Sequence, residues 1–150
     1  MEQHTRFIQN AVDAFVQGRG YFCGLLYAYG LPGSTEELAE QIFQAYRAQH
    51  PEAQIHREDG SAVHPKIVDR IKRGQSLWTL AKADYDLLIL EHIEGIAGRE
   101  TSEEIIYSLL DKMLLQGRQI LVTGNVPVPQ MLTLAPRICT QLSGGINLPV

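Results

Sequence analysis

The sequence predicts an α/β fold of one domain, in which a parallel β-sheet is covered by helices on both faces. Short, continuous apolar runs alternate along the chain with longer segments whose apolar residues recur at helical spacing. Continuous apolar runs are typical of strands that are buried on both faces, as in a parallel sheet. Strands that alternate with helices imply right-handed crossover connections, and 150 residues suffice for one such domain.

The first half of the chain supplies two strands and three helices. Gly18 and Pro51 end the first two helices, because neither residue continues a helix well. The run that follows Gly20 is apolar up to Tyr29 and is predicted to be the first buried strand. The predicted elements are helix 4–17, strand 22–29, helix 35–50, short strand 53–57 and helix 65–72.

The second half supplies three strands and two helices. The run Asp86-Leu-Leu-Ile-Leu-Glu91 is apolar and ends in an acid, which is typical of a strand at the carboxyl edge of a parallel sheet. Gly117 ends the helix that follows. The predicted elements are strand 86–91, helix 101–117, strand 119–123, helix 127–142 and strand 146–150.

The segment from Gly30 to Glu37 has the frame of a phosphate-binding loop, G-x-x-x-x-G-K-[ST], but lacks its lysine. Gly30 and Gly33 could still present backbone N–H groups to a phosphate. Thr35, Glu36 and Glu37 occupy the last three positions of the pattern. Like charges about 4 Å apart repel by about 4 kcal/mol at an intermediate effective dielectric. The pattern therefore predicts weak nucleotide binding or none.

The same residues also predict the capped start of a helix. Ser34 and Glu37 fit the S-x-x-E capping box, in which each side chain accepts a hydrogen bond from the other residue's backbone N–H. A helix N-terminus attracts anions, and here the helix supplies its own. Thr101 and Glu104 repeat the pattern at the start of a later helix. This structural interpretation involves no nucleotide.

The composition argues against several functions. A net charge of −4 and a pI near 5.7 argue against a general affinity for the DNA backbone, which clustered Lys and Arg provide. The polar N-terminus lacks an apolar signal core, and no apolar run reaches the roughly 18 residues of a membrane span. Cys23 and Cys139 match no zinc or redox spacing. We expect a cytoplasmic protein without membrane association and without a metal site.

One basic cluster stands out in this acidic chain. Basic side chains with a neighbouring aromatic ring, here Trp78, can bind single-stranded DNA through phosphate contacts and stacking. The alternative is a solvated helix face with Trp78 packed beneath it, which the acidic balance of the chain favours. The cluster consists of Lys66, Arg70, Lys72 and Arg73.

Several motifs follow one another in a fixed order along the chain. They are His4-Thr-Arg-Phe7, Asp86–Glu94 followed by Gly98-Arg99 and Thr101–Glu104, Gly117–Asn125, and Leu134–Gln141. In this order they resemble the nucleotide-binding core of the DnaA and Hda branch of AAA+ ATPases, the bacterial replication initiators and their regulators. The resemblance implies a P-loop NTPase sheet of five parallel strands in the order 5-1-4-3-2, forming a single core domain over residues 1–150. The family's lid and helix-turn-helix domains would follow the fifth strand, and we expect both to be absent.

The departures from the family pattern concern the residues that handle phosphate. The family's magnesium-associated Asp falls on Glu91 and its catalytic acid on His92, which is a poor substitute for a carboxylate that polarises water. Gln141 replaces the arginine finger that the family offers to a neighbour's nucleotide. Asn125, at the family's sensor 1, and Arg137 are retained.

These observations lead to one main hypothesis and two alternatives. We expect a catalytically inactive DnaA-like module, without a cofactor, that acts by protein interaction and modulates the initiation of DNA replication. Its partner would be a DnaA initiator, a replisome component or a second copy of itself. The first alternative is a weak ATP- or ADP-binding ATPase that uses magnesium. The second is an accessory protein that binds single-stranded DNA.

Overall fold

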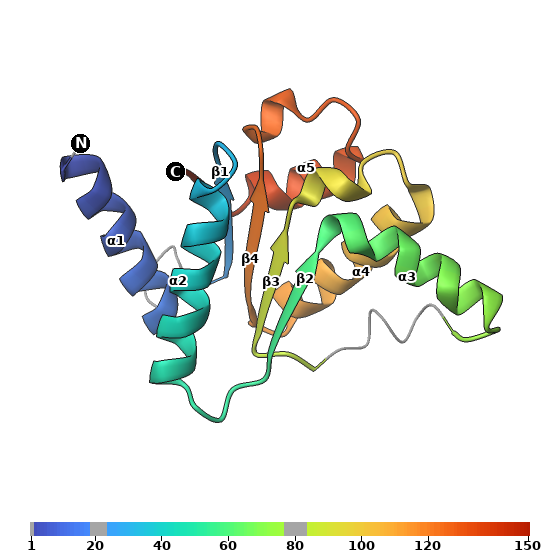
Figure 1. The fold of residues 1–150 in the computed structure, drawn as a ribbon, viewed down its shortest axis with the longest axis horizontal. Helices are drawn as coiled ribbons and strands as arrows, with labels where there is room; N and C mark the ends of the chain where they lie inside the picture. The colour runs from blue at the N-terminus through green and yellow to red at the C-terminus, as the bar shows by residue number, and fades with distance from the viewer. Residues whose placement is uncertain (1, 19–23, 77–83) are drawn as a thin grey trace.

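The computed structural model describes residues 2–18, 24–76 and 84–150, which alternate between helices and strands (Figure 1). Gly20, Cys23 and Trp78, named above, and the first two residues of the predicted strand 22–29 lie outside the described residues. The elements are α1 (Glu2–Gln17), β1 (Leu25–Tyr29), α2 (Ser34–Gln49), β2 (Ile55–Asp59), α3 (Gly60–Lys72), β3 (Leu87–Glu91), η3 (Ile93–Ile96), α4 (Glu100–Leu115), β4 (Gln119–Gly124), η4 (Val128–Gln130), α5 (Pro136–Ser143) and β5 (Ile146–Pro149).

The strands form one five-stranded sheet in the order β2-β3-β4-β1-β5, and every pairing is parallel. This confirms the predicted fold class and the strand order 5-1-4-3-2. The register aligns Tyr29 with Gly124 and Asp59 with Glu91, so the ends of these strands lie at the same edge. In an open α/β sheet, ligands bind beyond this carboxyl edge.

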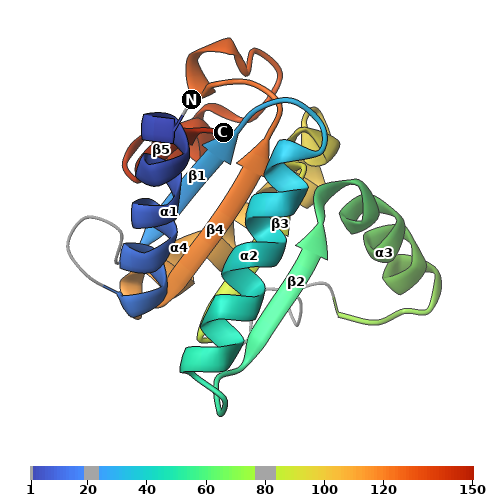
Figure 2. The same cartoon turned by 60° about the vertical axis from the view of Figure 1, so that its left-hand side comes forward.

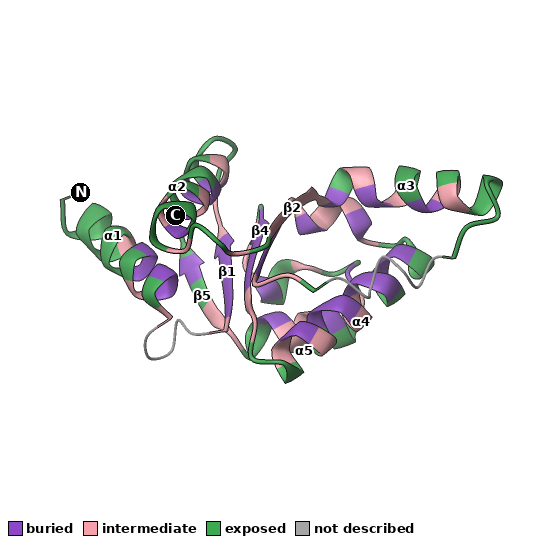
Figure 3. Cartoon of the chain, turned by 90° about the horizontal axis from the view of Figure 1, so that it is seen from below, coloured by how far each residue is buried: buried purple, intermediate pink, exposed green. Residues whose placement is uncertain are grey.

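The sheet is buried on both faces, because α1 and α2 cover one face while α3, α4 and α5 cover the other (Figures 2 and 3). Successive strand residues point to opposite faces. Leu26, Ile89 and Leu121 pack with α1 and α2, whereas Tyr27 and Leu88 pack with the helices of the opposite face. The inner strands β1 and β3 therefore carry an apolar residue at nearly every position, which is why their apolar runs predicted them. The edge strand β2 is only partly buried and mostly polar.

The second strand and the third helix begin at other residues than the sequence predicted. The second strand occupies 55–59 instead of 53–57, and α3 begins at Gly60 instead of Pro65. Asp59 explains both differences, because its carboxylate accepts hydrogen bonds from the backbone N–H of Ser61 at 2.8 Å and from its hydroxyl at 2.7 Å. This side chain caps α3 and ends β2.

The predicted helix at 127–142 is wrong in its first half. Residues 128–130 form the short 3₁₀ helix η4, and the α-helix begins only at Pro136. Proline lacks the N–H that a helix interior needs but fits the first helical position, so Pro136 starts α5. The N–H of Ala135 donates to the Glu103 carboxylate at 2.6 Å, which fixes the start of α5 against α4.

Both predicted capping boxes are also wrong. Helix α2 begins one residue early, with Gly33 as its N-cap, and it is Glu36 that reaches back to the Gly33 N–H. Helix α4 follows Arg99, which makes no side-chain cap, and Thr101 lies inside the helix. The predicted end at Gly117 is confirmed, because this residue adopts a φ of 71° directly after Gln116, the C-cap of the helix.

In the part of the chain that the structure describes, no helix combines the length and the apolar character needed to cross a bilayer.

Two glycines allow α3 to approach the end of β3 backbone to backbone. A Cβ atom on Gly60 would collide with the His92 carbonyl oxygen, and a Cβ atom on Gly95 would lie 2.5 Å from the Ser61 nitrogen. These contacts hold the first turn of α3 against η3, directly beside the carboxyl edge of the sheet.

We predict that Gly60→Ala lowers the free energy of unfolding by about 2 kcal/mol, because backbone atoms must move to admit the methyl group. Urea denaturation of the purified protein measures this change. Gly24→Ala is the matched control, since a Cβ atom at Gly24 meets nothing within 4 Å. Equal stability of the two variants would contradict the close packing of α3 on η3.

Candidate nucleotide site

The residues that the phosphate-loop pattern singled out gather at the carboxyl edge of the sheet. The loop 30–33 follows β1, Glu91 ends β3, and His92 comes next in the chain. Asn125 follows β4 and is exposed. The motif residues of the first, third and fourth strands are therefore brought to one edge, as a P-loop fold requires.

Glu36 and His92 form an ion pair across this edge. The Nε2 atom of His92 lies 2.7 Å from Oε1 of Glu36, and its Nδ1 atom lies 3.1 Å from Oδ2 of Asp59. The imidazole ring thus joins the first turn of α2 to the residue that caps α3. All three side chains are partly exposed, with relative accessibilities between 34% and 44%.

The second carboxylate oxygen of Glu36, Oε2, binds the N-terminus of α2, the helix to which Glu36 itself belongs. The Gly33 N–H donates to Oε2 of Glu36 at 2.5 Å, and the N–H of Ser34 donates to the Leu31 carbonyl at 3.2 Å. Gly33 has a φ of 97°, a left-handed conformation that favours glycine. Backbone donors that would face a phosphate in a P-loop are here bonded within the chain.

The backbone of His92 is fixed independently of its ring. Its φ of 55° makes it the one non-glycine residue with a positive φ in the ranges that the structure describes. Its N–H donates to the Thr123 hydroxyl on the neighbouring strand β4 at 3.1 Å. Left-handed backbone at a non-glycine residue is uncommon and occurs often at functional sites.

The ion pair shifts the protonation of both partners. The hydrogen bond to His92 lowers the pKa of Glu36 from 4.5 to about 2. The hydrogen bond to Glu36 raises the pKa of His92 above 6.5, and the bond to Asp59 adds to this against the opposing effect of burial. Burial raises the pKa of Glu94, and its Oε2 atom is buried with no hydrogen-bond partner.

Glu91, which the family resemblance led us to expect at the position of the magnesium-associated acid, is bound by a guanidinium group. The Nε and Nη2 atoms of Arg57 lie 2.9 and 3.4 Å from the two carboxylate oxygens of Glu91. A third nitrogen, Nη1, lies 2.5 Å from the Glu40 carboxylate on α2. The guanidinium group also lies 5.8 Å from the centre of the Phe43 ring. Two-point pairing of this kind is a strong, directional charge-assisted contact.

Arg137 and Gln141 lie on α5 and contact α4. The Arg137 guanidinium stacks over the Tyr107 ring at 4.5 Å, and the Gln141 side-chain amide donates to the Tyr107 carbonyl at 3.2 Å. The Oε1 atom of Gln141 is buried without a partner. Gln141, which the resemblance led us to expect at the arginine-finger position, thus points toward its own domain.

The basic cluster on α3 is partly neutralised by neighbouring acids. Lys66 pairs with Glu58 at 2.6 Å, and Arg73 pairs with Asp69 at 3.2 Å. Arg70 donates to the Ser76 carbonyl at 3.2 Å.

The sequence did not single out Arg57, Asp59 or Glu40 as site residues, although all three complete the polar network at the edge. Arg57 and Asp59 lie on β2 or at its end, next to β3, and only the sheet order brings them there.

Among residues 2–18, 24–76 and 84–150, no group of three or more His, Cys, Asp or Glu side chains has the arrangement of a metal site.

A parallel sheet in this order, with a glycine-containing loop between β1 and α2, defines an AAA+-type P-loop fold. The chain belongs to the family described as the bacterial DnaA ATPase domain, which matches residues 6–149. It is 25% identical over 129 residues to the chromosomal replication initiator protein DnaA of Sphingopyxis alaskensis, and this match covers 85% of the chain and 28% of the initiator. The chain therefore spans little more than a quarter of that relative.

Solved structures show the same fold at low sequence identity. Domain III of the Thermotoga maritima replication initiation protein DnaA superimposes with a TM-score of 0.86 at 15% identity, covering 97% of this chain and 61% of that one. A replication initiator DnaA bound to AMPPCP and single-stranded DNA gives a TM-score of 0.84 at 17% identity, covering 97% and 46%. The fold of the family is thus retained here.

We predict that His92→Asn lowers the free energy of unfolding more at about pH 6 than at about pH 9. The two losses should differ by about 0.5–1 kcal/mol, because the pair is partly exposed. The raised pKa of His92 gives stability that is fully present below 6.5 and is lost as the pH rises through the folded-state pKa. The lowered pKa of Glu36 gives stability that is lost only as the pH falls from 4.5 toward about 2. Asparagine tolerates the left-handed backbone.

Urea denaturation at both pH values measures the effect. The double variant Glu36→Gln, His92→Asn is the control, and adding His92→Asn to Glu36→Gln should leave a smaller dependence on pH. A pH-independent difference between the wild type and His92→Asn would contradict the charged pair.

Proposed function

We propose that this protein is a DnaA-family AAA+ module that works without nucleotide, by binding a protein partner during replication initiation in the cytoplasm. The observation that supports this proposal is the Glu36–His92 ion pair. It lies at the loop to which the P-loop pattern assigns phosphate, and it supports a reversal of the two charges that the pattern predicts there.

The reversal preserves an attraction inside the protein while removing the attraction for a nucleotide. The P-loop pattern places a cation at position 36, and the family places an acid at position 92. Here the anion stands at position 36 and the histidine at position 92, so the two groups still attract each other. A triphosphate entering this loop would meet the Glu36 carboxylate, which already accepts the Gly33 N–H.

The same contacts occupy the two motif residues that would serve hydrolysis, His92 and Glu91. A general base needs a free acceptor near the attacking water. Both ring nitrogens of His92 are paired with carboxylates, and both carboxylate oxygens of Glu91 are paired with Arg57. The described residues thus do not fit a magnesium–nucleotide complex, and we infer that the protein is not an ATPase.

The fold of the family is retained while internal contacts occupy the proposed nucleotide site, and this combination supports a role in protein binding. Two leucines are strongly exposed in the loops that follow β1 and β4, at the same edge as the site: Leu31 at 77% and Leu132 at 89%. Exposed apolar side chains beside a polar network are typical of the centre and rim of protein interfaces. We propose that this edge binds a DnaA initiator.

The first test is calorimetric titration with ATP and magnesium. We expect the wild type to show no binding up to about 1 mM nucleotide. We expect the double variant Glu36→Lys, His92→Asp, which restores the family's charges, to bind at least about tenfold more tightly than the wild type. The single variant Glu36→Lys is the matched control, because it places a lysine beside His92 without restoring the acid.

Micromolar binding of ATP by the wild type, abolished by changes at Gly33 or Glu91, would overturn this proposal. It would favour the alternative of a weak nucleotide-binding ATPase.

The second test concerns the interaction edge. We expect the protein to associate with the full-length DnaA of its own host, equally well with and without added nucleotide, in analytical ultracentrifugation. Leu31→Asp and Leu132→Asp should each weaken this association by at least about tenfold, since a buried unpaired charge costs several kcal/mol. Leu115→Asp is the control, because Leu115 is 81% exposed at the far end of α4. An affinity that neither Leu31→Asp nor Leu132→Asp changes, or the absence of association, would contradict the proposed edge.

A second candidate function is the binding of single-stranded DNA by α3. It is favoured by the relative that was solved bound to single-stranded DNA and by the exposed ends of Lys66, Lys72 and Arg73. The pairing of Lys66 and Arg73 with acids limits the available charge.

For this candidate, we expect binding of an oligothymidine that is measurable at about 50 mM salt and is lost by about 200 mM. Lys72→Ala should weaken it, whereas Lys112→Ala near the end of α4 should not. Fluorescence anisotropy of the oligothymidine measures the salt dependence and the effect of each substitution. No anisotropy change at low salt would eliminate this function.

A further inference from the structure

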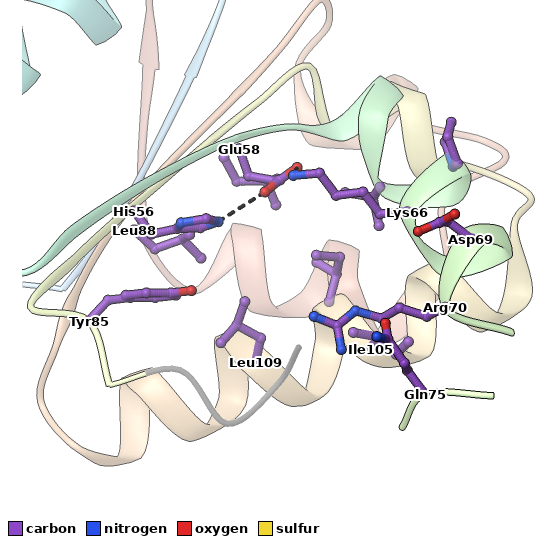
Figure 4. Close-up of a pocket in the computed structure, with 14 residues that line it drawn as sticks. His56, Glu58, Lys66, Asp69, Arg70, Gln75, Tyr85, Leu88, Ile105 and Leu109 are labelled. Carbon is purple, nitrogen blue, oxygen red and sulfur yellow. Dashed lines mark hydrogen bonds and ion pairs between the residues drawn. The ribbon is translucent and has the colours of Figure 1, made fainter. Parts of the chain in front are cut away.

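A second concave site lies on the opposite side of β3 from the ion pair between Arg57 and Glu91. It is a cavity of about 660 Å³ between α3, the strands β2 and β3, and α4 (Figure 4). Small-molecule sites usually occupy about 300–1,000 Å³. Its walls contain none of the phosphate-loop motif residues.

The cavity exists because α3 is attached mainly through its first turns. The glycine contacts described above hold its N-terminus on η3, and Val63 and Ile67 are buried. One turn further, Ile71 is 60% exposed, and Figure 1 shows α3 extending away from the sheet. The helix therefore stands apart from α4 and leaves an apolar surface between them.

The floor of the cavity requires an apolar ligand. It is formed by aliphatic side chains of β3, α3 and α4 that are themselves buried. They are Val63, Leu88, Leu90, Ile105, Ile106 and Leu109.

One wall of the cavity is flat and aromatic. The rings of His56 and Tyr85 stack with their centres 4.6 Å apart and an angle of 8° between their planes. Both rings line the cavity, and Figure 4 shows them at the end opposite Arg70 and Gln75. A flat wall beside an aliphatic floor favours a planar ring system, because stacking and apolar burial then act together.

The acids that line the cavity are already paired with bases. Glu58 lies 2.9 Å from His56 and 2.6 Å from Lys66, and Asp69 pairs with Arg73. Lys66 and Arg70 also line the cavity, so two cationic side chains balance the two acids. A charged ligand would lose its hydration and gain little net attraction in return. The remaining polar groups, among them the Tyr85 hydroxyl and the Gln75 amide, can accept or donate a hydrogen bond.

We propose that this cavity is a ligand site for a neutral, planar aromatic molecule that carries one hydrogen-bonding group. The site is independent of the nucleotide loop and of the proposed interaction edge.

The test is titration of the full chain with N-phenylnaphthylamine, a neutral aromatic probe whose fluorescence rises in apolar surroundings. We expect saturation at one site per chain with a dissociation constant of about 10 μM. The sulfonated analogue anilinonaphthalene sulfonate has nearly the same rings with a negative charge, and we expect it to bind at least about fivefold more weakly.

Leu109→Trp fills the floor and should weaken binding of the neutral probe at least about tenfold. Leu115→Trp is the matched control on the same helix, because Leu115 is 81% exposed and lies outside the cavity. Circular dichroism establishes that both variants are folded. If Leu109→Trp does not fold, Tyr85→Ala replaces it, and loss of the aromatic wall should weaken binding at least about threefold.

Three results would overturn the proposal. They are no saturable fluorescence change, equal loss of binding in the Leu109 and Leu115 variants, and tighter binding of the sulfonated analogue than of the neutral probe.

Discussion

The attraction between the Glu36 carboxylate and the His92 imidazole is the interaction on which the carboxyl edge of this sheet depends. It joins the start of α2 to the residue that follows β3, and through Asp59 it reaches the cap of α3. Without a positive group at position 92, the carboxylates of Glu36, Asp59 and Glu94 would face one another unbalanced. Their mutual repulsion would act on a loop whose Gly30, Gly33 and Ser34 N–H groups are bonded within the chain.

The fold itself does not require this edge to bind phosphate. Both apolar cores lie below it and consist of strand and helix residues that carry no charge. The sheet of a DnaA-type domain can therefore persist after its phosphate-binding charges have been exchanged. The internal pairs of His92 with Glu36 and Asp59 bring opposite charges together at this edge. The proposed loss of nucleotide binding and the retention of the family fold are thus compatible.

The inner strands were predictable because burial on both faces requires apolar residues at successive positions, as at 87–90 in β3 and 120–122 in β4. Helix starts were less predictable, since Asp59 and Gly33 compete as caps with residues one to five positions later. Glu36 and His92 were recognised as departures from a motif, but their contact is set by the sheet. Arg57 reaches Glu91 only because β2 pairs with β3, a relation that local sequence does not contain.

The most direct measurement is the pH titration of the His92 imidazole by NMR, in the wild type and in Glu36→Gln. The ion pair predicts a midpoint above 6.5 in the wild type and a clear decrease in the variant, because the largest contribution to the raised pKa is the hydrogen bond to Glu36. A midpoint that stays unchanged when Glu36 loses its charge would contradict the pairing, and with it the explanation of the nucleotide site.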